Sequence, residues 1–405
     1  MRDPERRVVV TGAGVLCHLG DDLPRIEAFL HEGRGLPFVH HPPAVEAGSR
    51  CQIFGSYRGE LSAERRQARF MGRAALMGYK AALAALAQSQ LTRRDIAVVA
   101  GSGTGDVAAH VEVQETLARA AGSRVSPTAI LRMMSSTVSA NLATALRTTG
   151  PSFSASAACA GGAYNILLAA ELIEHGHVDA AIAGGVEIAD DHFHAGFDAM
   201  RAFNGQDNDH PERASRPYAR DRAGFIFGEG AGMVVLETKA AAEARGAPVL
   251  GILAGYGMSS DGTGDMVSPT AEGAFQAMER ALRHAGVHPE QIDYVHTHGT
   301  STVIGDVTEV RALRRLFGRQ VPYSSTKGYI GHTISAAGAI NAIFTLSMLR
   351  GGWIAPCINA EPIDPELQDY PPVTRPTEKA MRLALSNSLG FGGTNVALVL
   401  ARERK

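Results

Sequence analysis

Cysteine and net charge are both scarce in this sequence, and each scarcity excludes a class of protein. Only four of the 405 residues are cysteine, at positions 17, 51, 159 and 357. None forms a CxxC pair, the spacings suit no zinc site, and four are too few to hold so long a chain together by disulfides. The 39 basic and 41 acidic residues leave a formal charge of −2. This balance gives no overall basic field for nucleic acid, and the composition predicts a cytoplasmic protein.

Long apolar runs are also missing. The run at 8–10 is too short for a signal peptide and is followed by glycines. Because no stretch reaches about 18 uninterrupted apolar residues, we predict no membrane span. Apolar residues still make up 45% of the chain and charged residues 20%, which is the composition of a globular protein with a sizeable core.

Short β-type runs alternate with helical stretches rich in alanine and leucine. This alternation predicts an α/β fold with helices packed on sheets. We expect strands at 7–11, 96–100, 179–183, 232–237, 252–256, 293–297, 382–386 and 395–400. We expect helices at 68–89, 161–175, 272–285, 306–317 and 336–350. Glycine-rich breaks at 12–14 and 101–103 are expected to end two of the strands, where loops commonly carry the chemistry.

Two short motifs recur in the same order. Gly-Ala-Tyr-Asn at 162–165 returns as Gly-Ala-Ile-Asn at 338–341, each before a long apolar helix, and Thr-Gly-Ala-Gly at 11–14 resembles Ala-Gly-Tyr-Gly at 254–257. Such matches arise by chance in a chain rich in glycine and alanine, but their shared order suggests a duplicated α/β half. The duplication would divide the chain into residues 1–245 and 246–405.

Cys159 lies where a strand-like segment leads into an apolar helix. Its neighbours are alanine and glycine, which permit a sharp turn and a close approach of substrate. The backbone N–H groups of a helix N-terminus would lower the pKa of a thiol at this place and favour the thiolate. The position therefore indicates a nucleophile, and a small cysteine packed in the junction is the alternative.

Two histidines lie among small polar residues. His298 begins the loop His-Gly-Thr-Ser-Thr after a strand, and His332 follows Tyr-Ile-Gly just before the second repeat helix. Both are candidate site residues, although a lone histidine in such a loop is more often merely solvated. The other thirteen histidines look like surface or structural positions. His192 and His194 could form a metal pair, but no third ligand of suitable spacing stands nearby, so we predict no metal site.

A third glycine-rich loop, at 387–395, lies between two apolar strands near the end of the chain. Its glycines allow backbone amides to point into a cavity, which suits an oxyanion hole. The loop is a poor nucleotide site, because no helix follows it and no lysine supplies a P-loop.

Together these motifs resemble one family. Ala158-Cys159, the His298-Gly-Thr-Ser-Thr loop, Thr326-Lys327 with Gly331-His332, and the closing Gly-Phe-Gly-Gly-Thr-Asn resemble the elongating β-ketoacyl-acyl carrier protein synthases of the thiolase-like superfamily. The resemblance covers nearly the whole chain. It implies a five-layer α/β/α/β/α fold of two duplicated halves, the first carrying the nucleophile and the second the histidine pair.

The resemblance also implies a role for each matching residue. Cys159 would hold the acyl chain as a thioester, and the backbone N–H groups of Cys159 and Phe391 would form the oxyanion hole. His298 and His332 would stabilise the enolate formed when malonyl thioester loses CO₂. Further roles would be Lys327 holding the histidine network with Glu309 as its ion-pair partner, Thr300 and Thr302 binding the pantetheine arm, Phe391 and Phe197 gating the site, and Thr104 standing at an acyl-pocket wall shared across a dimer.

The implied partner is an acidic acyl carrier protein, which brings the phosphopantetheine arm, so no metal or redox cofactor is expected. Exposed basic residues should then surround the entrance despite the net charge, and Arg66, Arg69, Arg124 and Arg201 are the candidates. The second partner implied is another synthase-like chain. It would be identical, or a chain-length-factor-like subunit without the nucleophile.

Several positions depart from the family's usual pattern. After Gly331-His332 the family has glycine where this chain has Ser335, and glutamate where it has Asn341. The second change removes a buried acid beneath the histidines and must alter their hydrogen bonds. With Tyr329, these departures slightly favour a specialised polyketide or polyene synthase over a fatty-acid enzyme.

Two other classes remain as alternatives. A non-catalytic chain-length subunit would usually lack the cysteine that this chain has at 159. A thiolase acting on coenzyme A esters would need a second cysteine in the closing loop, which has none.

Overall fold

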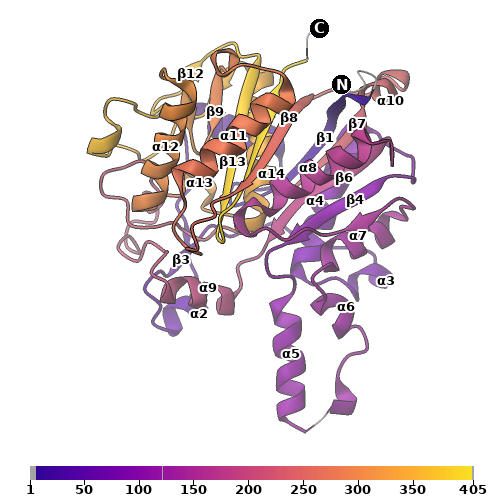
Figure 1. The fold of residues 1–405 in the computed structure, drawn as a ribbon. Helices are drawn as coiled ribbons and strands as arrows, with labels where there is room; N and C mark the ends of the chain where they lie inside the picture. The colour runs from indigo at the N-terminus through magenta and orange to yellow at the C-terminus, as the bar shows by residue number, and fades with distance from the viewer. Residues whose placement is uncertain (1–5, 121, 404–405) are drawn as a thin grey trace.

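A mixed ten-stranded sheet runs through the computed structural model, which describes residues 6–120 and 122–403 (Figure 1). The strand order is β10-β9-β13-β14-β8-β1-β7-β6-β4-β5. The first half of the chain supplies β1 (Val8–Leu16), β4 (Ala97–Ser102), β5 (Ser152–Phe153), β6 (Ala180–Glu187) and β7 (Gly230–Thr238). The second half supplies β8 (Gly251–Ser260), β9 (Tyr294–His296), β10 (Tyr323–Ser324), β13 (Leu383–Gly390) and β14 (Thr394–Ala401). Two short pairs lie apart, β2 (Val39–His40) with β3 (Ile53–Phe54), and β11 (Trp353–Ile354) with β12 (Thr377–Glu378).

The two halves of this sheet are built alike. In the first, β1 and β7 are antiparallel, as are β7 and β6, while β6–β4 and β4–β5 are parallel. In the second, β8–β14 and β14–β13 are antiparallel, while β13–β9 and β9–β10 are parallel. Within the sheet, the two halves join where Val9 pairs with Ile252 and Val10 with Gly251. This repetition confirms the duplicated α/β fold.

Helices complete five layers. Figure 1 shows α8 (Gly161–Glu174) and α14 (Ala337–Gly351) between the two half-sheets, and both contribute to one apolar cluster with strands of each half. The outer face of the first half-sheet is covered by α4 (Arg73–Ser89) and α7 (Thr137–Leu146), and that of the second by α11 (Ala271–Ala285) and α12 (Val303–Phe317). The remaining helices are α1 (Leu23–Glu32), α2 (Pro42–Glu46), α3 (Arg65–Ala68), α5 (Val107–Ala118), α6 (Ala129–Met133), α9 (Asp191–Ala199), α10 (Lys239–Ala244) and α13 (Lys327–Ile330).

Of the two predicted glycine breaks, the one at 101–103 does end its strand, because β4 ends at Ser102, whereas the one at 12–14 does not. Residues 12–14 lie inside β1, which continues to Leu16 past a register shift between Val10 and Gly12. The glycines serve a close approach instead, because a Cβ on Gly14 would collide with the carbonyl oxygen of Ala81 on α4. In the second half, a Cβ on Gly255 would lie 2.7 Å from the carbonyl oxygen of Ala281 on α11. The repeated glycines therefore let one helix in each half lie directly on the sheet.

A single helix over 68–89 was also predicted, and this was wrong. α3 ends at Ala68 and α4 begins at Arg73, after Gly72 in an extended conformation. A side chain at Gly72 would collide with the carboxylate of Asp106, so this glycine marks a contact that the local helical pattern does not reveal.

We expect Gly14→Ala to lower the free energy of unfolding by about 1–3 kcal/mol, the usual cost of overpacking a close contact. Gly196→Ala is the matched control, because a Cβ there meets nothing within 4 Å and helix propensity favours alanine. Urea unfolding of both variants measures the difference. Equal stabilities would contradict the close approach of β1 and α4.

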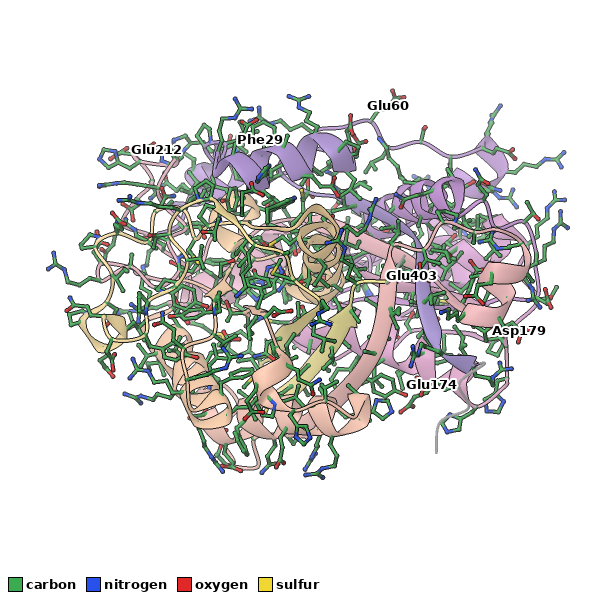
Figure 2. All side chains as sticks on the ribbon, turned by 90° about the horizontal axis from the view of Figure 1, so that it is seen from above. Phe29, Glu60, Glu174, Asp179, Glu212 and Glu403 are labelled. Atoms are coloured by element: carbon green, nitrogen blue, oxygen red, sulfur yellow. The ribbon has the colours of Figure 1, made fainter. Side chains whose placement is uncertain are left out.

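One described stretch, Ile334–Gly351, is long and apolar enough to cross a membrane by length and composition. However, 89% of it is buried inside the protein, and it contains the whole of α14 between the half-sheets. Its apolar character is thus explained by the central layer. Other charged side chains lie at the periphery, as the exposed Glu60 and Glu212 show (Figure 2).

Candidate active site

Cys159 lies in a short 3₁₀ turn, Ala158–Ala160, directly before α8. This is the predicted junction, although the preceding strand is only β5, two residues long. The side chain is buried. The turn is held to the closing loop, because Thr394 Oγ1 donates to the carbonyl oxygen of Ala157 at 3.2 Å.

Strained backbone accompanies each of the three predicted site loops. Ala158, next to the cysteine, has a φ of 44°, Ser301 within the His298 loop has 70°, and Ile334 after His332 has 39°. Non-glycine residues rarely adopt positive φ, and such strain persists only where the surroundings fix the conformation. The fold therefore holds all three loops in defined positions.

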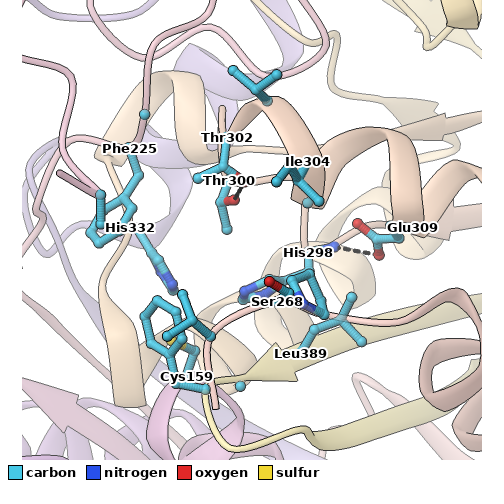
Figure 3. Close-up of a pocket in the computed structure, with 18 of the residues that line it drawn as sticks. Cys159, Phe225, Ser268, His298, Thr300, Thr302, Ile304, Glu309, His332 and Leu389 are labelled. Atoms are coloured by element: carbon cyan, nitrogen blue, oxygen red, sulfur yellow. Dashed lines mark hydrogen bonds between the residues drawn. The ribbon is translucent and has the colours of Figure 1, made fainter. Parts of the chain in front are cut away.

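His298 is held by its own main chain. Its backbone N–H donates to Glu309 Oε1 at 2.8 Å, while the next residue, Gly299, donates to Oε2 at 2.9 Å (Figure 3). From the other side, Lys327 Nζ donates to the carbonyl oxygen of His298. The expected ion pair between Lys327 and Glu309 is absent from the described part of the chain. The two charges instead flank the backbone of His298.

The ring of His332 is oriented by a hydrogen bond to its Nδ1. The backbone N–H of Ile334 donates to His332 Nδ1 at 3.2 Å. Because a neutral imidazole carries one proton, this acceptor role leaves the proton on Nε2. Burial and the charge of Lys327 hold the pKa values of His298 and His332 well below the usual value. Both rings are therefore neutral.

The nucleophile and the two histidines converge. The sulfur of Cys159 and one ring nitrogen from each histidine all lie within 4.8 Å of one another, and the two rings meet edge to face at 5.1 Å (Figure 3). Three such groups could in principle share a metal ion. However, His332 Nε2 carries a proton and has no free lone pair for a metal. The group suits hydrogen-bond donation to an oxyanion better.

The pKa of Cys159 differs from the prediction. Burial raises the pKa of its thiol to about 12, and the charge of Lys327 and the backbone N–H of Phe391 lower it only in part. The predicted lowering assumed an open helix N-terminus, whereas only 3% of this residue is exposed. The resting group is therefore a thiol.

The closing glycine loop supplies the predicted amides. The backbone N–H groups of Phe391 and of Cys159 itself both act on the sulfur. Gly392 and Gly393, each at positive φ, turn the chain beside them. The ring of Phe391 lies 5.8 Å from that of Phe197, so the two predicted gate residues are neighbours.

A pocket of about 330 Å³ opens onto this group. Thr300 and Thr302 line it, with their hydroxyls 2.9 Å apart, and Arg201 lies at its rim. Exposed apolar residues also lie along the rim: Met200, Met266, Val267, Val303 and Ile304.

The other arginines and Thr104 lie elsewhere. Arg66, Arg69 and Arg124 are exposed but do not line the pocket. Thr104 does not line it either, since its hydroxyl donates to Glu187 Oε1 at 3.0 Å. A role for Thr104 across a dimer stays a prediction.

Sequence reasoning missed two residues near the site. Phe225 lines the pocket and its ring meets that of His332 edge to face at 5.2 Å. Glu187 is fully buried beside Ser335, and burial raises its pKa to about 7. The sequence signal that could have identified Glu187 is its position as an acidic residue at the end of an apolar strand.

The departures from the family pattern are all buried. Ser335 packs so closely that a Cβ on Gly161 would lie 2.5 Å from its hydroxyl. Asn341 is 2% exposed, on the face of α14 toward β13. Tyr329 is a core residue whose hydroxyl donates to the carbonyl oxygen of Pro356 at 2.9 Å, so it acts in packing.

Comparison with known proteins places this geometry in a family. The family model for the β-ketoacyl synthase N-terminal domain matches residues 5–242, and that for the C-terminal domain matches residues 250–361. The 3-oxoacyl-[acyl-carrier-protein] synthase 1 of Escherichia coli is 38% identical over 408 residues, covering 98% of this chain and 99% of that protein. Synthase 2 of Vibrio cholerae is 37% identical over 416 residues, with the same coverage.

Solved structures agree. A β-ketoacyl synthase from Burkholderia phymatum superimposes with a TM-score of 0.93 at 33% identity, covering all of both chains. A ketosynthase in complex with its chain length factor, from Xenorhabdus doucetiae, gives 0.84 at 28% identity and covers 98% of each chain. With both halves matched and relatives aligned over almost its whole length, this chain belongs to the β-ketoacyl synthase family.

Proposed function

We propose that this protein condenses an acyl group held on Cys159 with malonyl-acyl carrier protein, giving 3-oxoacyl-acyl carrier protein and CO₂. The convergence of Cys159 with two neutral histidines in one pocket carries the proposal. A non-catalytic subunit would have no use for a cysteine between two oxyanion donors. A thiolase is disfavoured because Phe391, and no second cysteine, stands opposite Cys159 in the closing loop.

The first half-reaction loads the enzyme. The sulfur of Cys159 attacks the acyl thioester of one carrier protein while the backbone N–H groups of Cys159 and Phe391 stabilise the oxyanion. The bond from the acyl carbon to the pantetheine sulfur breaks, and the thiol proton ends on that leaving sulfur. The raised pKa of Cys159 keeps the thiol protonated until an acyl donor arrives.

The second half-reaction forms the carbon–carbon bond. Malonyl thioester loses CO₂, and the electron pair of the broken bond becomes an enolate whose oxygen accepts hydrogen bonds from the Nε2–H groups of His298 and His332. The enolate carbon attacks the acyl carbonyl, and the thioester bond to Cys159 breaks. The released thiolate takes a proton from solvent, since decarboxylation of the malonyl carboxylate consumes one proton overall. None of these steps requires a metal or a redox cofactor.

The carrier protein is the proposed donor of both substrates. Relatives of this chain are named for acyl carrier protein, and the pocket has Thr300 and Thr302 along the path that a pantetheine arm would take. Arg201 lines the pocket and is exposed, so an acidic carrier would find a basic side chain at the entrance, while docking on the exposed Arg66, Arg69 and Arg124 stays a prediction.

A second synthase-like chain is the other proposed partner. β5 is an edge strand with an exposed Phe153. The helices α5 and α6 lie at the bottom of the view in Figure 1, and Leu117 and Ile130 on them are 58% and 65% exposed. An unpaired edge and exposed apolar side chains of this kind are where a second chain can bind. Two structural relatives are titled as a ketosynthase with a chain length factor, which supports a related chain as the partner, and an identical chain is the alternative. We place the assembly in the cytoplasm.

Intact-mass spectrometry after incubation with acyl-carrier proteins tests the function. The panel contains saturated, polyunsaturated and aryl-primed acyl groups, with and without a candidate partner chain. A mass gain equal to the acyl group supports the proposal. The largest gain with saturated groups would assign fatty-acid elongation, and a gain restricted to polyene or aryl groups would assign specialised polyketide synthesis. No gain under any condition would contradict the proposal.

The ionisation of Lys327 predicts an alkaline limit to decarboxylation. Burial lowers the pKa of Lys327 to about 8, so the cation is present below that pH and is lost above it. Since its charge favours the developing enolate, CO₂ release from malonyl-acyl carrier protein should fall as pH rises through about 8. Lys327→Met should abolish the dependence and reproduce the low alkaline rate throughout. A flat profile in the unsubstituted protein would show that the charge contributes nothing.

A further inference from the structure

A buried hydrogen-bonded chain lies beneath the catalytic group and is used by none of the steps above. His296 is fully buried on β9, two residues before His298. Its Nδ1 lies 2.9 Å from Thr345 Oγ1 on α14, and its Nε2 lies 3.1 Å from Thr326 Oγ1, next to Lys327. We call the three side chains of Thr345, His296 and Thr326 the relay.

The direction of the bonds in the relay follows from one further contact. Thr345 Oγ1 donates its only proton to the carbonyl oxygen of Asn341 at 2.6 Å. The hydroxyl of Thr345 must then accept from His296 Nδ1–H, which leaves Nε2 of a neutral ring to accept from Thr326. Each of the three side chains therefore has only one compatible pattern of donating and accepting. A proton added to His296 would reverse the bond to Thr326.

The surroundings of His296 keep it neutral. Burial and the charge of Lys327 lower its pKa to about 3. Lys327, on α13, is the charged group that acts on the ring, and Glu309 and Asp306, on α12, act on Lys327. From β13 and α14 the ring faces no charge in the described chain, only the hydroxyl-bearing neighbours and Asn341.

Asn341 is the position at which a substitution could introduce a charge next to the relay. On α14 it shares a face with Gly338 and Thr345, and a Cβ at Gly338 would lie 2.9 Å from Ser388 Oγ on β13. Ser386, the strand partner of His296, lies on the same side. Asn341 Nδ2, Ser386 Oγ and Ser388 Oγ are buried without a hydrogen-bond partner among the described residues. The side-chain amide of Asn341 thus makes no hydrogen bond of its own, and it is an uncharged group next to the relay.

We propose that the relay positions the Thr326–Lys327 segment beneath the histidine pair, and that the neutral side chain of Asn341 leaves the buried His296 without an anion that would favour its protonation. Lys327 then directs its Nζ to the carbonyl of His298, balanced by Glu309 on the far side. His296 is a positioning residue in this scheme and touches no reacting atom. The inference rests on the proposed condensation for its kinetic consequences, but not for the state of His296.

Asn341→Asp tests the charge at nearly constant shape. An opposite charge close to an imidazole raises its pKa by about 1–3 units. From about 3 in the parent, the pKa of His296 should rise to about 4–6, so malonyl decarboxylation by Asn341→Asp should fall below about pH 6. Asn341→Leu, which is neutral and keeps the backbone carbonyl, should retain the parent profile. Identical profiles for the two variants would overturn the role of Asn341.

Thr345→Val tests the relay itself. It removes the acceptor of His296 Nδ1–H without changing volume, and misplacement of the Lys327 segment should lower kcat for decarboxylation about ten- to a hundredfold with KM unchanged. Thr345→Ser keeps the hydroxyl and should restore the rate, and acyl capture by Cys159 should stay intact in both. Equal loss of acyl capture in Thr345→Val would show a merely structural role and overturn the proposal.

¹⁵N NMR of histidine-labelled protein separates this inference from the proposed function. With the His296 signals assigned through His296→Gln, the parent should show a neutral Nδ1–H ring from about pH 5 to 8, and Asn341→Asp an added titration between about pH 4 and 6. These spectra need no substrate, so they decide the state of His296 even if the chain captures no acyl group. A charged His296 in the parent would overturn the inference.

Discussion

Cys159→Ala should abolish acyl capture and condensation together. The variant should show no mass gain with any acyl-carrier protein, and its condensation rate should fall by about 10⁴-fold or more, the order of loss seen when a covalent nucleophile is removed. The reason is geometric, because Cys159 is the described thiol within 4.8 Å of both histidines, while Cys17, Cys51 and Cys357 are buried elsewhere. Intact-mass spectrometry and product assays measure the two losses.

The same variant separates loading from decarboxylation. The alanine leaves the histidine pair and Lys327 in place, so malonyl-acyl carrier protein should still bind and release CO₂. Cys357→Ala is the matched control, because it removes another buried thiol and should retain capture. An acylated Cys159→Ala protein would contradict the mechanism outright.

The sequence predicts most of the site because its chemistry depends on short local motifs. Cys159, His298 and His332 each lie in a short motif near the end of a strand or the start of a helix, which marks them as candidates, and the resemblance to a family of synthases supplies their roles. The duplicated glycines were visible in the same way. Their role could not be predicted, because only the packed structure shows that Gly14 and Gly255 allow a helix to lie directly against the sheet.

What the sequence did not predict depends on distant contacts. The pKa of Cys159 follows from burial by segments that are far apart in the chain, and it outweighs the local helix terminus. Glu309 and Lys327 were expected to pair, yet both bind the main chain of His298. In the sequence His296 resembles an ordinary core histidine, because its two threonine partners are 30 and 49 residues away and reach the ring only in the folded chain.

His298→Ala and His332→Ala should show the opposite pattern to Cys159→Ala. Each removes one donor to the enolate oxygen, and loss of an oxyanion donor costs about 10²–10³-fold in rate. Acyl capture should persist, because the oxyanion hole for loading is made by the backbone amides of Cys159 and Phe391. Single-turnover CO₂ release and intact-mass measurement on the same samples give both numbers, and a variant that loses capture as strongly as decarboxylation would contradict this division.

The two histidines should also differ in how well glutamine replaces them. Lys327 and Glu309 place His298 through its main chain, whereas His332 has its ring fixed by the N–H of Ile334 on Nδ1. A glutamine at 298 keeps the backbone anchors and offers an N–H donor, so it should recover part of the lost rate. A glutamine at 332 forfeits the contact that orients the donor and should recover less. Equal recovery would mean that orientation by Ile334 is unimportant, and the donors then act by proximity to the substrate alone.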